Sequence, residues 1–320
     1  MKYEMKPEFE KRMKTLLPDT ADFEKFEKII HTSPRKFIRC NTLKISPNNL
    51  LKKLKKKWDI KQPFPKYPEI ILVTSQLEPG GLGNSIEHIL GYYYVQEISS
   101  MLPPIALDPK PEEFILDLFA APGSKTTQIA AKMDNKGTII ANDLKIDRIK
   151  ILSSNLERCG VSNTIVSRKD AIAFCSKLSK TNFKFDKVLL DAPCSGEGTL
   201  RSSPKTFNIW NPKIVKKLSR QQKKFFAFAV KLLKPGGTIV YSTCTHSPEE
   251  NEEVVDFALK NFPLKLESIS LPLKSRPGIT KWENKSFSKE LTKTCRIYPQ
   301  DNNSEGFFIS KFTLLKGVKQ

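Results

Sequence analysis

Apolar residues in the second half of the sequence form short runs that alternate with stretches of helical periodicity. Most of these runs carry no charge inside, and residues with apolar positions three or four apart follow them. This alternation is typical of a parallel sheet that helices cover on both faces. We therefore predict an α/β fold in which ligands bind beyond the carboxyl ends of the strands. The predicted strands are 114–119, 137–143, 163–170, 187–194 and 236–244, with two later ones at 264–270 and 305–314.

The first hundred residues follow a different pattern, which predicts helices and then a small strand–helix–strand unit. Apolar residues recur at helical spacing over residues 1–30. The segment 36–45 alternates like a strand, Pro47 opens a helix, and 69–74 is a second strand. The proline-containing segment 108–112 marks a boundary. We predict three units: N-terminal helices at 1–35, a small α+β domain at 36–105, and a larger α/β domain at 106–320.

Positive charge is the main feature of the composition. The 320 residues include 54 Lys and Arg against 34 Asp and Glu, a formal net charge of +20. Such an excess points to a polyanionic partner, most simply a nucleic acid. The charge is concentrated at 44–66 and 200–224, and the second segment has no acid but contains Phe207 and Trp210. Because aromatic rings stack on unpaired bases, we predict that 200–224 contacts RNA, unless Trp210 packs inside.

Several classes of protein are excluded by what the sequence lacks. No run reaches the ~18 apolar residues of a membrane span, and the first residues lack the apolar segment of a secretory signal. The six cysteines form no Cys-x-x-Cys pair, so neither a zinc ribbon nor a disulfide framework is indicated. Three histidines argue against a His-rich metal site and against a Ser-His-Asp hydrolase. We expect a cytoplasmic protein that binds neither a metal nor a membrane.

The first strand of the α/β domain runs into a loop of small residues that suits a ligand. Gly123 and its neighbours let the backbone approach a ligand at the N-terminus of the next helix. The loop is not a phosphate-binding P-loop, because Ser124 separates the glycine from the lysine. Asp143 ends the second strand 20 residues after Gly123, the spacing at which a carboxylate binds a ribose hydroxyl. With Asp170 and Asp191 on the next strands, the set predicts an adenosine-bearing cofactor, although one such acid alone is usually a helix cap.

Two cysteines end predicted strands at the edge where ligands bind. Cys194 ends the fourth predicted strand in Asp-Ala-Pro-Cys, and Cys244 ends the fifth. Neighbouring strands lie ~4.8 Å apart, so the two thiols share one cleft if these strands are adjacent. A disulfide between them is disfavoured in a reducing compartment. The other cysteines, which we expect to be buried apolar residues, are Cys40, Cys159, Cys175 and Cys295.

These motifs and their flanking segments resemble the Sun (Fmu-like) family of RNA 5-methylcytosine methyltransferases. The order of Asp-Ala-Pro-Cys followed by Thr-Cys-Thr is specific to that family. Two positions depart from its pattern: Ser124 stands where Gly is usual, and Phe119 where Cys is common. The matching segments are FIRCNTLKI (37–45), YVQEISSML (94–102), LDLFAAPGSKTTQ (116–128), LLDAPCSGEGTLR (189–201), QQKKFFAFAVKLLKPGGTIVYSTCT (221–245), PEENEEVV (248–255) and RIYPQDNNSEGFFIS (296–310).

The resemblance implies a Rossmann-like class I methyltransferase sheet with S-adenosylmethionine as the methyl donor, and a small RNA-recognition-like domain before it. It assigns Cys244 as the nucleophile that adds to carbon 6 of cytosine, and Cys194 to the later release step. Asp191, protonated or sharing a proton, would bind ring nitrogen 3, and Lys125 would hold the exocyclic oxygen and favour a thiolate nearby. The implied cofactor-binding residues are Phe119, Ala120, Ala121, Pro122, Gly123, Ser124, Lys125, Asp143, Arg148, Asp170 and Asp191.

The resemblance also implies an RNA substrate, and we expect tRNA in preference to ribosomal RNA. The two predicted domains resemble those of compact archaeal tRNA enzymes. We expect no additional module that reads the end of the tRNA. DNA is not expected, because DNA cytosine methyltransferases use the Pro-Cys cysteine as their nucleophile and Cys244 marks the RNA family. A non-catalytic RNA-binding or assembly factor would have lost Cys244 or the Asp-Ala-Pro-Cys motif, and both are present. A monomer is expected.

Overall fold

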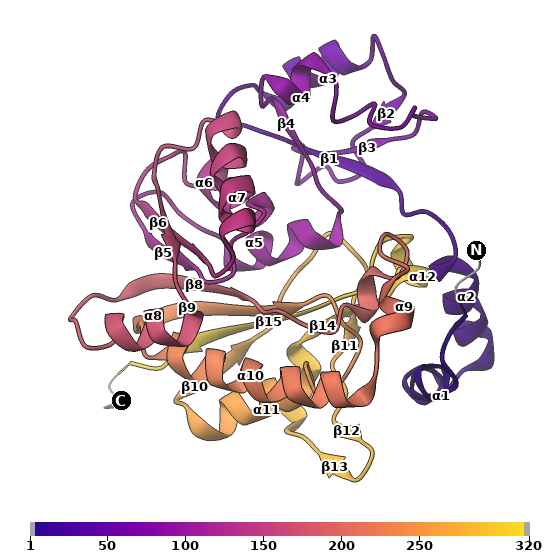
Figure 1. The fold of residues 1–320 in the computed structure, drawn as a ribbon, viewed down its shortest axis with the longest axis vertical. Helices are drawn as coiled ribbons and strands as arrows, with labels where there is room; N and C mark the ends of the chain where they lie inside the picture. The colour runs from indigo at the N-terminus through magenta and orange to yellow at the C-terminus, as the bar shows by residue number, and fades with distance from the viewer. Residues whose placement is uncertain (1–3, 317–320) are drawn as a thin grey trace.

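The computed structural model describes residues 4–316, and its centre is a large mixed sheet (Figure 1). Expectations that concern residues 1–3 and 317–320, including the start of the chain, lie outside the described residues. Five parallel strands stand in the order β9–β8–β5–β6–β7, which confirms the predicted parallel core. Their bounds are Phe114–Asp117 (β5), Thr138–Asp143 (β6), Thr164–Arg168 (β7), Phe185–Asp191 (β8) and Leu233–Thr243 (β9).

Antiparallel strands extend this sheet beyond β9. The strand β15 pairs with β9 along most of its length and carries β14 and β10 as further partners. The strands β14 and β11 are too short to show a periodicity, so the sequence did not predict them. The bounds of the C-terminal elements are Leu264–Glu267 (β10), Arg276–Pro277 (β11), Lys281–Trp282 (β12), Lys285–Ser286 (β13), Lys289–Lys293 (η3), Cys295–Ile297 (β14), Pro299–Asn302 (α12) and Phe307–Leu314 (β15).

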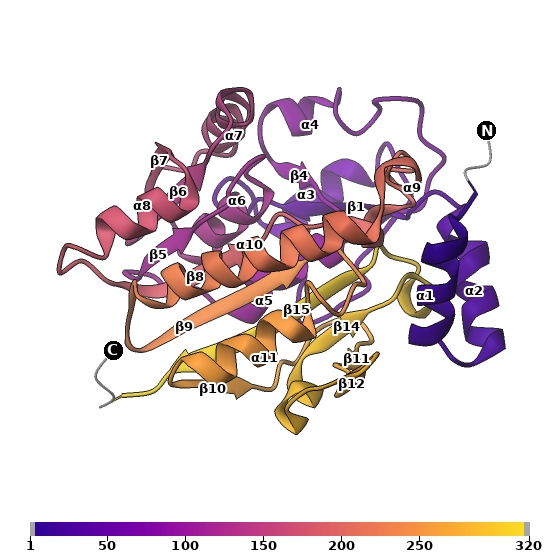
Figure 2. The same ribbon diagram turned by 60° about the horizontal axis from the view of Figure 1, so that its bottom comes forward.

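Helices cover both faces of the sheet, because alternate residues of the central strands point to opposite sides. Leu189 and Val240 face the core under α5 and α6, whereas Val188 and Tyr241 face the core under α8, α10 and α11. Figure 2 shows α10 and α11 lying along one face. No helix in the described part of the chain is long and apolar enough to cross a membrane. The bounds are Leu102–Leu107 (α5), Ser124–Lys132 (α6), Ile146–Cys159 (α7), Ala171–Leu178 (α8), Pro212–Val230 (α10) and Glu252–Asn261 (α11).

A small antiparallel sheet with the order β2–β3–β1–β4 precedes the large one. Ser46 caps the helix α3, and Leu50 and Leu54 of that helix pack on Ile38 of the sheet. The boundary that we expected between residues 105 and 106 falls inside α5, which packs on β8 and β9 of the large sheet. The bounds are Lys36–Cys40 (β1), Pro47–Leu54 (α3), Ile60–Lys61 (β2), Ile70–Val73 (β3), Ile86–Ile89 (α4), Tyr93–Val95 (β4) and Ser99–Met101 (η1).

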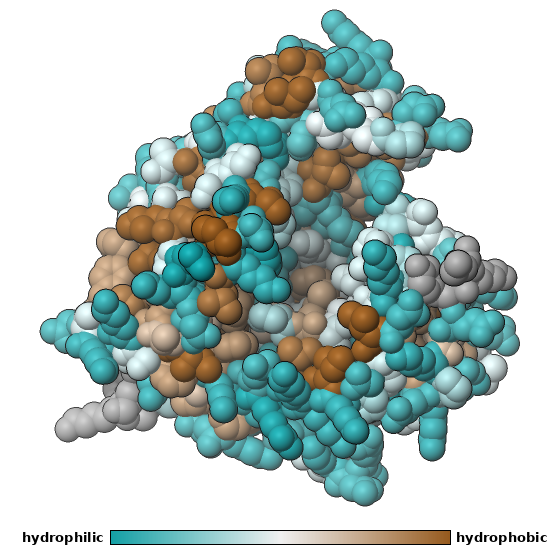
Figure 3. Space-filling view, viewed as in Figure 1, coloured by the Kyte–Doolittle hydropathy of each residue, from teal (hydrophilic) through white to brown (hydrophobic). Residues whose placement is uncertain are grey.

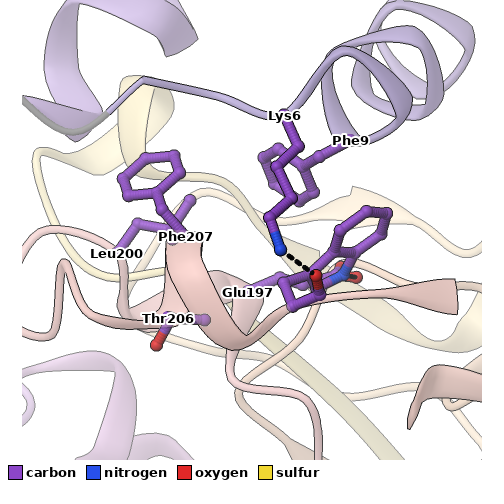
Figure 4. Close-up of a pocket in the computed structure, with 7 residues that line it drawn as sticks. Lys6, Phe9, Glu197, Leu200, Thr206 and Phe207 are labelled. Atoms are coloured by element: carbon purple, nitrogen blue, oxygen red, sulfur yellow. Dashed lines mark hydrogen bonds between the residues drawn. The ribbon is translucent and has the colours of Figure 1, made fainter. Parts of the chain in front are cut away.

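The N-terminal helices α1 (Pro7–Leu16) and α2 (Thr20–Ile30) pack against the segment that follows β8. That segment contains η2 (Glu197–Thr199) and α9 (Thr206–Ile209). Phe9 of α1 meets the ring of Trp210 edge to face at 5.1 Å, and together with Phe207 they line a narrow crevice (Figure 4). Phe207 and Trp210 are only 4% and 3% exposed. The prediction that these two rings stack on RNA bases is therefore wrong, because α1, far away in sequence, covers them.

The face of the molecule that is drawn in Figures 1 and 3 is hollowed between the small sheet and the part formed by α9 and the N-terminal helices (Figure 3). The chain leaves β8 in the direction of α9, beside this hollow (Figure 1). The edge at which the parallel strands end is thus reached from the side where the small sheet stands.

Candidate active site

The carboxyl ends of β8 and β9 bring the two motif cysteines together. The strands pair in parallel, with Asp191 opposite Ser242. Cys194 and Cys244 follow shortly after these residues, and their sulfur atoms lie 3.2 Å apart. The main-chain N–H of Cys244 also donates to the Cys194 sulfur at 3.3 Å. The two strands are neighbours, which was the condition for a shared cleft.

Short contacts join the two loops that carry these cysteines. The hydroxyl oxygens of Ser195 and Thr245 lie 2.8 Å apart, and the N–H of Gly198 donates to the carbonyl oxygen of Cys244 at 2.8 Å. A Cβ at Gly198 would lie 2.2 Å from the carbonyl oxygen of Gly306, so only glycine allows this approach of two backbones. The relative position of the two sulfur atoms is therefore set by the backbone around them.

The surroundings of Cys194 favour its protonated form. The hydrogen bond with Cys244, burial and the charge of Glu250 raise the pKa of the Cys194 thiol well above its usual value. A thiol with a raised pKa carries its proton at neutral pH and is a poor nucleophile. The contact between the two sulfur atoms lets a proton pass from one to the other.

Lys125 and Asp191 form an ion pair beside the cysteines. The Lys125 Nζ lies 2.8 Å from Asp191 Oδ2, and Ser242 donates to Asp191 Oδ1 at 2.6 Å. Lys125 also donates to the Ser100 hydroxyl at 3.0 Å and lies 5.6 Å from the ring centre of Phe307. Burial alone would lower the pKa of Lys125, but the charge of Asp191 raises it above its usual value. The ammonium group therefore stays charged, and it can supply the proton that Asp191 was expected to share.

Two buried carboxylates mark the ends of β5 and β6. Asp117 accepts a hydrogen bond from the Thr126 hydroxyl at 2.7 Å, and its second oxygen has no partner. Burial raises the pKa of Asp117 to about 7. Asp143 Oδ2 also lacks a well-aligned donor, although Arg148 Nη1 lies 3.0 Å away. Buried oxygens without partners are rare in native structures, and a ligand with hydroxyl groups at this edge would satisfy them.

The loop between β5 and α6 has the features expected of a cofactor loop. Gly123 adopts a φ of +102°, a left-handed conformation that favours glycine, and precedes the first turn of α6. The carbonyl oxygen of Ala121 accepts a hydrogen bond from Arg148 on α7. Ala120 and Ala121 are buried, so this loop offers backbone and not bulky side chains to a ligand. The residues of this edge therefore fit an adenosine-bearing group.

Asp170 occupies a different setting. Its exposed carboxylate accepts hydrogen bonds from the N–H groups of Ile172 and Ala173 at 3.1 and 3.0 Å and so caps α8. This is the helix-cap role that the sequence left open, and a contact with adenine stays a prediction.

Comparison with known proteins identifies the family. Residues 104–313 match the family described as 16S rRNA methyltransferase RsmB/F, and residues 5–98 match the N-terminal domain of 16S rRNA methyltransferase RsmF. The tRNA (cytosine(49)-C(5))-methyltransferase of Pyrococcus abyssi is 45% identical over 310 residues, which are 96% of this chain and 97% of that protein. This chain belongs to the RsmB/F family of RNA methyltransferases.

Other RsmB/F relatives are longer or are known as structures. Ribosomal RNA small subunit methyltransferase F of Pectobacterium carotovorum is 39% identical over 95% of this chain, which spans only 61% of that relative. A methyltransferase homolog from Pyrococcus horikoshii has a TM-score of 0.83 at 36% identity and covers 95% of this chain and 94% of its own. NSun6 from Pyrococcus horikoshii, solved with SFG, has a TM-score of 0.84 at 28% identity and covers 98% and 99%. The predicted fold and the predicted S-adenosylmethionine-dependent RNA methyltransferase class are thereby confirmed.

The structure gathers most of the predicted site residues of this RsmB/F chain at one edge of the sheet. Cys194, Cys244, Lys125 and Asp191 lie together after β8, β9 and β5, whereas Asp170 makes no contact with them. In residues 4–316 no group of three or more His, Cys, Asp or Glu is placed to hold a metal ion.

Sequence reasoning missed several neighbours of this site. Ser100 and Phe307 both contact the Lys125 ammonium group. Both residues lie in segments that match the family, but the resemblance assigned no function to them. Asp117 ends β5, just before the loop that leads to α6. It does not have the 20-residue spacing from Gly123 that pointed to Asp143. Arg39, from β1 of the small sheet, donates to the carbonyl oxygen of Ser124 at 2.7 Å, and no local pattern in the sequence indicates this contact.

Proposed function

We propose that this protein transfers a methyl group to carbon 5 of cytosine in RNA, with tRNA as the favoured substrate, through a covalent bond between Cys244 and the base. The observation that supports it is the pair of sulfur atoms 3.2 Å apart beside the Lys125–Asp191 ion pair. The proposal includes a monomer that acts in the cytoplasm, and light scattering of the purified protein tests the monomer.

Addition of a thiolate solves the difficulty that carbon 5 of cytosine is a poor nucleophile. The Cys244 sulfur forms a bond to carbon 6, and the electron pair of the carbon 5–carbon 6 double bond moves into the ring. A proton shared by Lys125 and Asp191 stabilises the negative charge that develops on ring nitrogen 3. The ring then has an electron-rich carbon 5. S-adenosylmethionine, when bound, supplies the electrophilic methyl group for that carbon.

The adduct is resolved by loss of a proton and of the sulfur. A base removes the hydrogen of carbon 5 as a proton, the double bond to carbon 6 re-forms, and the electron pair of the carbon–sulfur bond returns to Cys244. Cys194 lies in contact with Cys244 and exchanges protons in this step. The assignment of the attack to Cys244 and of the release to Cys194 is the one that the family resemblance implies.

The residues that would hold the methyl donor are those of the buried edge. Asp143 and Asp117 would accept hydrogen bonds from its hydroxyl groups, and the loop 119–125 would lie along its amino-acid part. Arg148 forms an ion pair with Asp143, in which Nη1 lies 3.0 Å from Oδ2. Asp170 would contact the adenine with the carboxylate oxygen that does not cap α8.

The choice of tRNA is supported by the Pyrococcus abyssi enzyme, which this chain matches from end to end. A second candidate is ribosomal RNA, which is the substrate named for the RsmF relatives. Exposed lysines on α3 and α10 supply the charge that either RNA requires. The target cytosine must leave its stack to reach the cysteines, at a cost of a few kcal/mol.

A denaturing gel tests the mechanism and the substrate together. Cys194→Ala is incubated with S-adenosylmethionine and total small RNA, and we expect a covalent protein–RNA band because release is blocked. The band should be absent in Cys194→Ala/Cys244→Ala. Sequencing of the trapped RNA distinguishes tRNA from ribosomal fragments. An active wild type with no band for any RNA would exclude the two-cysteine mechanism.

A further inference from the structure

Glu250 lies fully buried just before α11, in the Pro-Glu-Glu-Asn-Glu segment. Its carboxylate accepts a hydrogen bond from the N–H of Ser195 at 3.1 Å and another from Gln222 Nε2 at 2.8 Å. No ion pair to Glu250 is found within residues 4–316. Burial and the charge of Glu197 raise the pKa of Glu250 to about 8, so this is a costly place for a carboxylate. A carboxylate kept in such a place calls for a reason other than stability.

The contacts of Glu250 and Gln222 enclose Cys194 along the chain. Gln222 of α10 is fully buried and donates to the carbonyl oxygen of Pro193 at 2.9 Å as well as to Glu250. Pro193 and Ser195 are the residues on either side of Cys194. The two side chains therefore fix both peptide groups that orient the Cys194 thiol.

Asn251, the next residue, makes the corresponding contacts around Cys244. It is fully buried, accepts from the Thr243 hydroxyl at 2.6 Å and donates to the carbonyl oxygen of Thr245 at 2.9 Å. Thr243 and Thr245 stand on either side of Cys244. Two consecutive residues at the start of α11 thus each hold one of the two cysteines.

We propose that Glu250 and Asn251 are positioning residues with separate tasks, Glu250 for the release step through Cys194 and Asn251 for the attack by Cys244. This inference rests on the proposed function. Neither residue touches the base, and each acts through the backbone of the cysteine that it holds. Because catalytic groups must be held to within a fraction of an ångström, loss of either set of contacts slows one step and not the other.

The two tasks predict opposite changes in the amount of trapped adduct. In Glu250→Leu no acceptor remains for the N–H of Ser195 or for Gln222 Nε2, so the Cys194 loop loosens. We expect turnover to fall about tenfold or more and the covalent RNA band to accumulate, as in Cys194→Ala. In Cys194→Ala/Asn251→Asp the donor to Thr245 is lost, and we expect the band to form about tenfold more slowly than in Cys194→Ala alone.

Matched variants separate positioning from general damage. Glu253→Leu makes the same chemical change three residues on, at a partly exposed carboxylate paired with Lys223 and Lys285, and should behave as wild type. Thermal melting checks the fold of each variant. If Glu250→Leu does not fold, Gln222→Met removes the hydrogen bonds to Glu250 and to the carbonyl oxygen of Pro193 and must accumulate the band. If Asn251→Asp does not fold, Thr243→Val must slow band formation.

The outcomes are distinct. Accumulation in Glu250→Leu that disappears in Glu250→Leu/Cys244→Ala, with slow formation in the Asn251 variant, supports the inference. A folded Glu250→Leu that loses activity without any band, or two variants that behave alike, overturns it. Absence of the band in Cys194→Ala itself is the failure of the proposed function and is read from that control alone.

Discussion

The guanidinium group of Arg39, on the first strand of the small sheet, donates to the carbonyl oxygen of Ser124 in the first turn of α6 at 2.7 Å. It also donates to the Thr127 hydroxyl at 2.8 Å and is only 2% exposed. Burial lowers the pKa of Arg39 to about 10. A buried cation that joins the small sheet to α6 makes the position of the first turn of α6 depend on the small sheet.

Arg39→Met should therefore weaken binding of S-adenosylmethionine. Loss of hydrogen bonds from a charged group costs about 1.5–3 kcal/mol of unfolding free energy, and the loosened first turn of α6 should raise the dissociation constant several-fold. Denaturant unfolding and calorimetric titration measure the two effects. Arg158→Met is the matched control, because Arg158 joins α7 to the small sheet through His88 and Tyr93. Equal loss of cofactor affinity in both variants would contradict a specific role for Arg39.

The 3.2 Å contact between the Cys194 and Cys244 sulfurs predicts sensitivity to oxidants. A movement of about 1 Å brings the sulfurs to bonding distance. Diamide should take up two electrons and two protons from the two thiols, leave a disulfide, and abolish methyl transfer until dithiothreitol is added. Intact-protein mass and non-reducing peptide mapping check the bond. Cys194→Ala should form no such disulfide, and a single oxidised thiol in the wild type would contradict the prediction.

The buried carboxyl of Asp117 predicts a dependence of stability on pH. Its pKa is about 7 in the folded chain, against 3.8 as the ordinary value. Between these values the folded protein keeps a proton that the unfolded chain has lost, so this group lowers stability as pH rises, and its full cost is reached above about pH 7.

Asp117→Asn removes this dependence while its amide oxygen can still accept from Thr126. Relative to the wild type without cofactor, the variant should gain about 2–4 kcal/mol of unfolding free energy between about pH 4 and 7. Urea unfolding at several pH values measures it. Asp186→Asn is the control: Lys234 holds the pKa of that partly exposed carboxyl below its usual value, so the variant should lose stability by an amount that changes only below about pH 4. A difference that does not change with pH would count against the assignment.

The exposed lysines at the start of α10 predict a salt-dependent contact with RNA. Lys213, Lys216 and Lys217 are exposed, whereas the aromatic residues before them are buried. Replacement of all three by glutamine should weaken RNA binding and reduce the slope of log affinity against log salt by about 0.7 for each phosphate that the variant no longer neutralises. Filter binding at several salt concentrations measures the slope. The exposed lysines Lys177, Lys180 and Lys231, near the opposite end of β8, provide a control triple variant that should leave the slope unchanged.

The sequence was most informative where a local pattern carries the structure. Uncharged apolar runs indicated the parallel strands, because a strand buried on both faces has no place for a charge. The residue types at the strand ends indicated the cofactor loop and the two cysteines, because parallel strands end at one edge. The family resemblance then assigned roles to these residues.

Contacts between distant segments could not be found in this way. The burial of Trp210 depends on Phe9 of α1, and the place of α5 depends on β8 and β9. Likewise, Gln222 on α10 and Glu250 before α11 meet only because both helices cover the same face of the sheet. The spacing of residues along the chain determined the strands, the cofactor loop and the order of the two cysteines. The pairing of β8 with β9, and the packing of α1, α10 and α11 around the loops after them, decided which side chains surround the sulfurs, because burial and hydrogen bonding depend on neighbours in space.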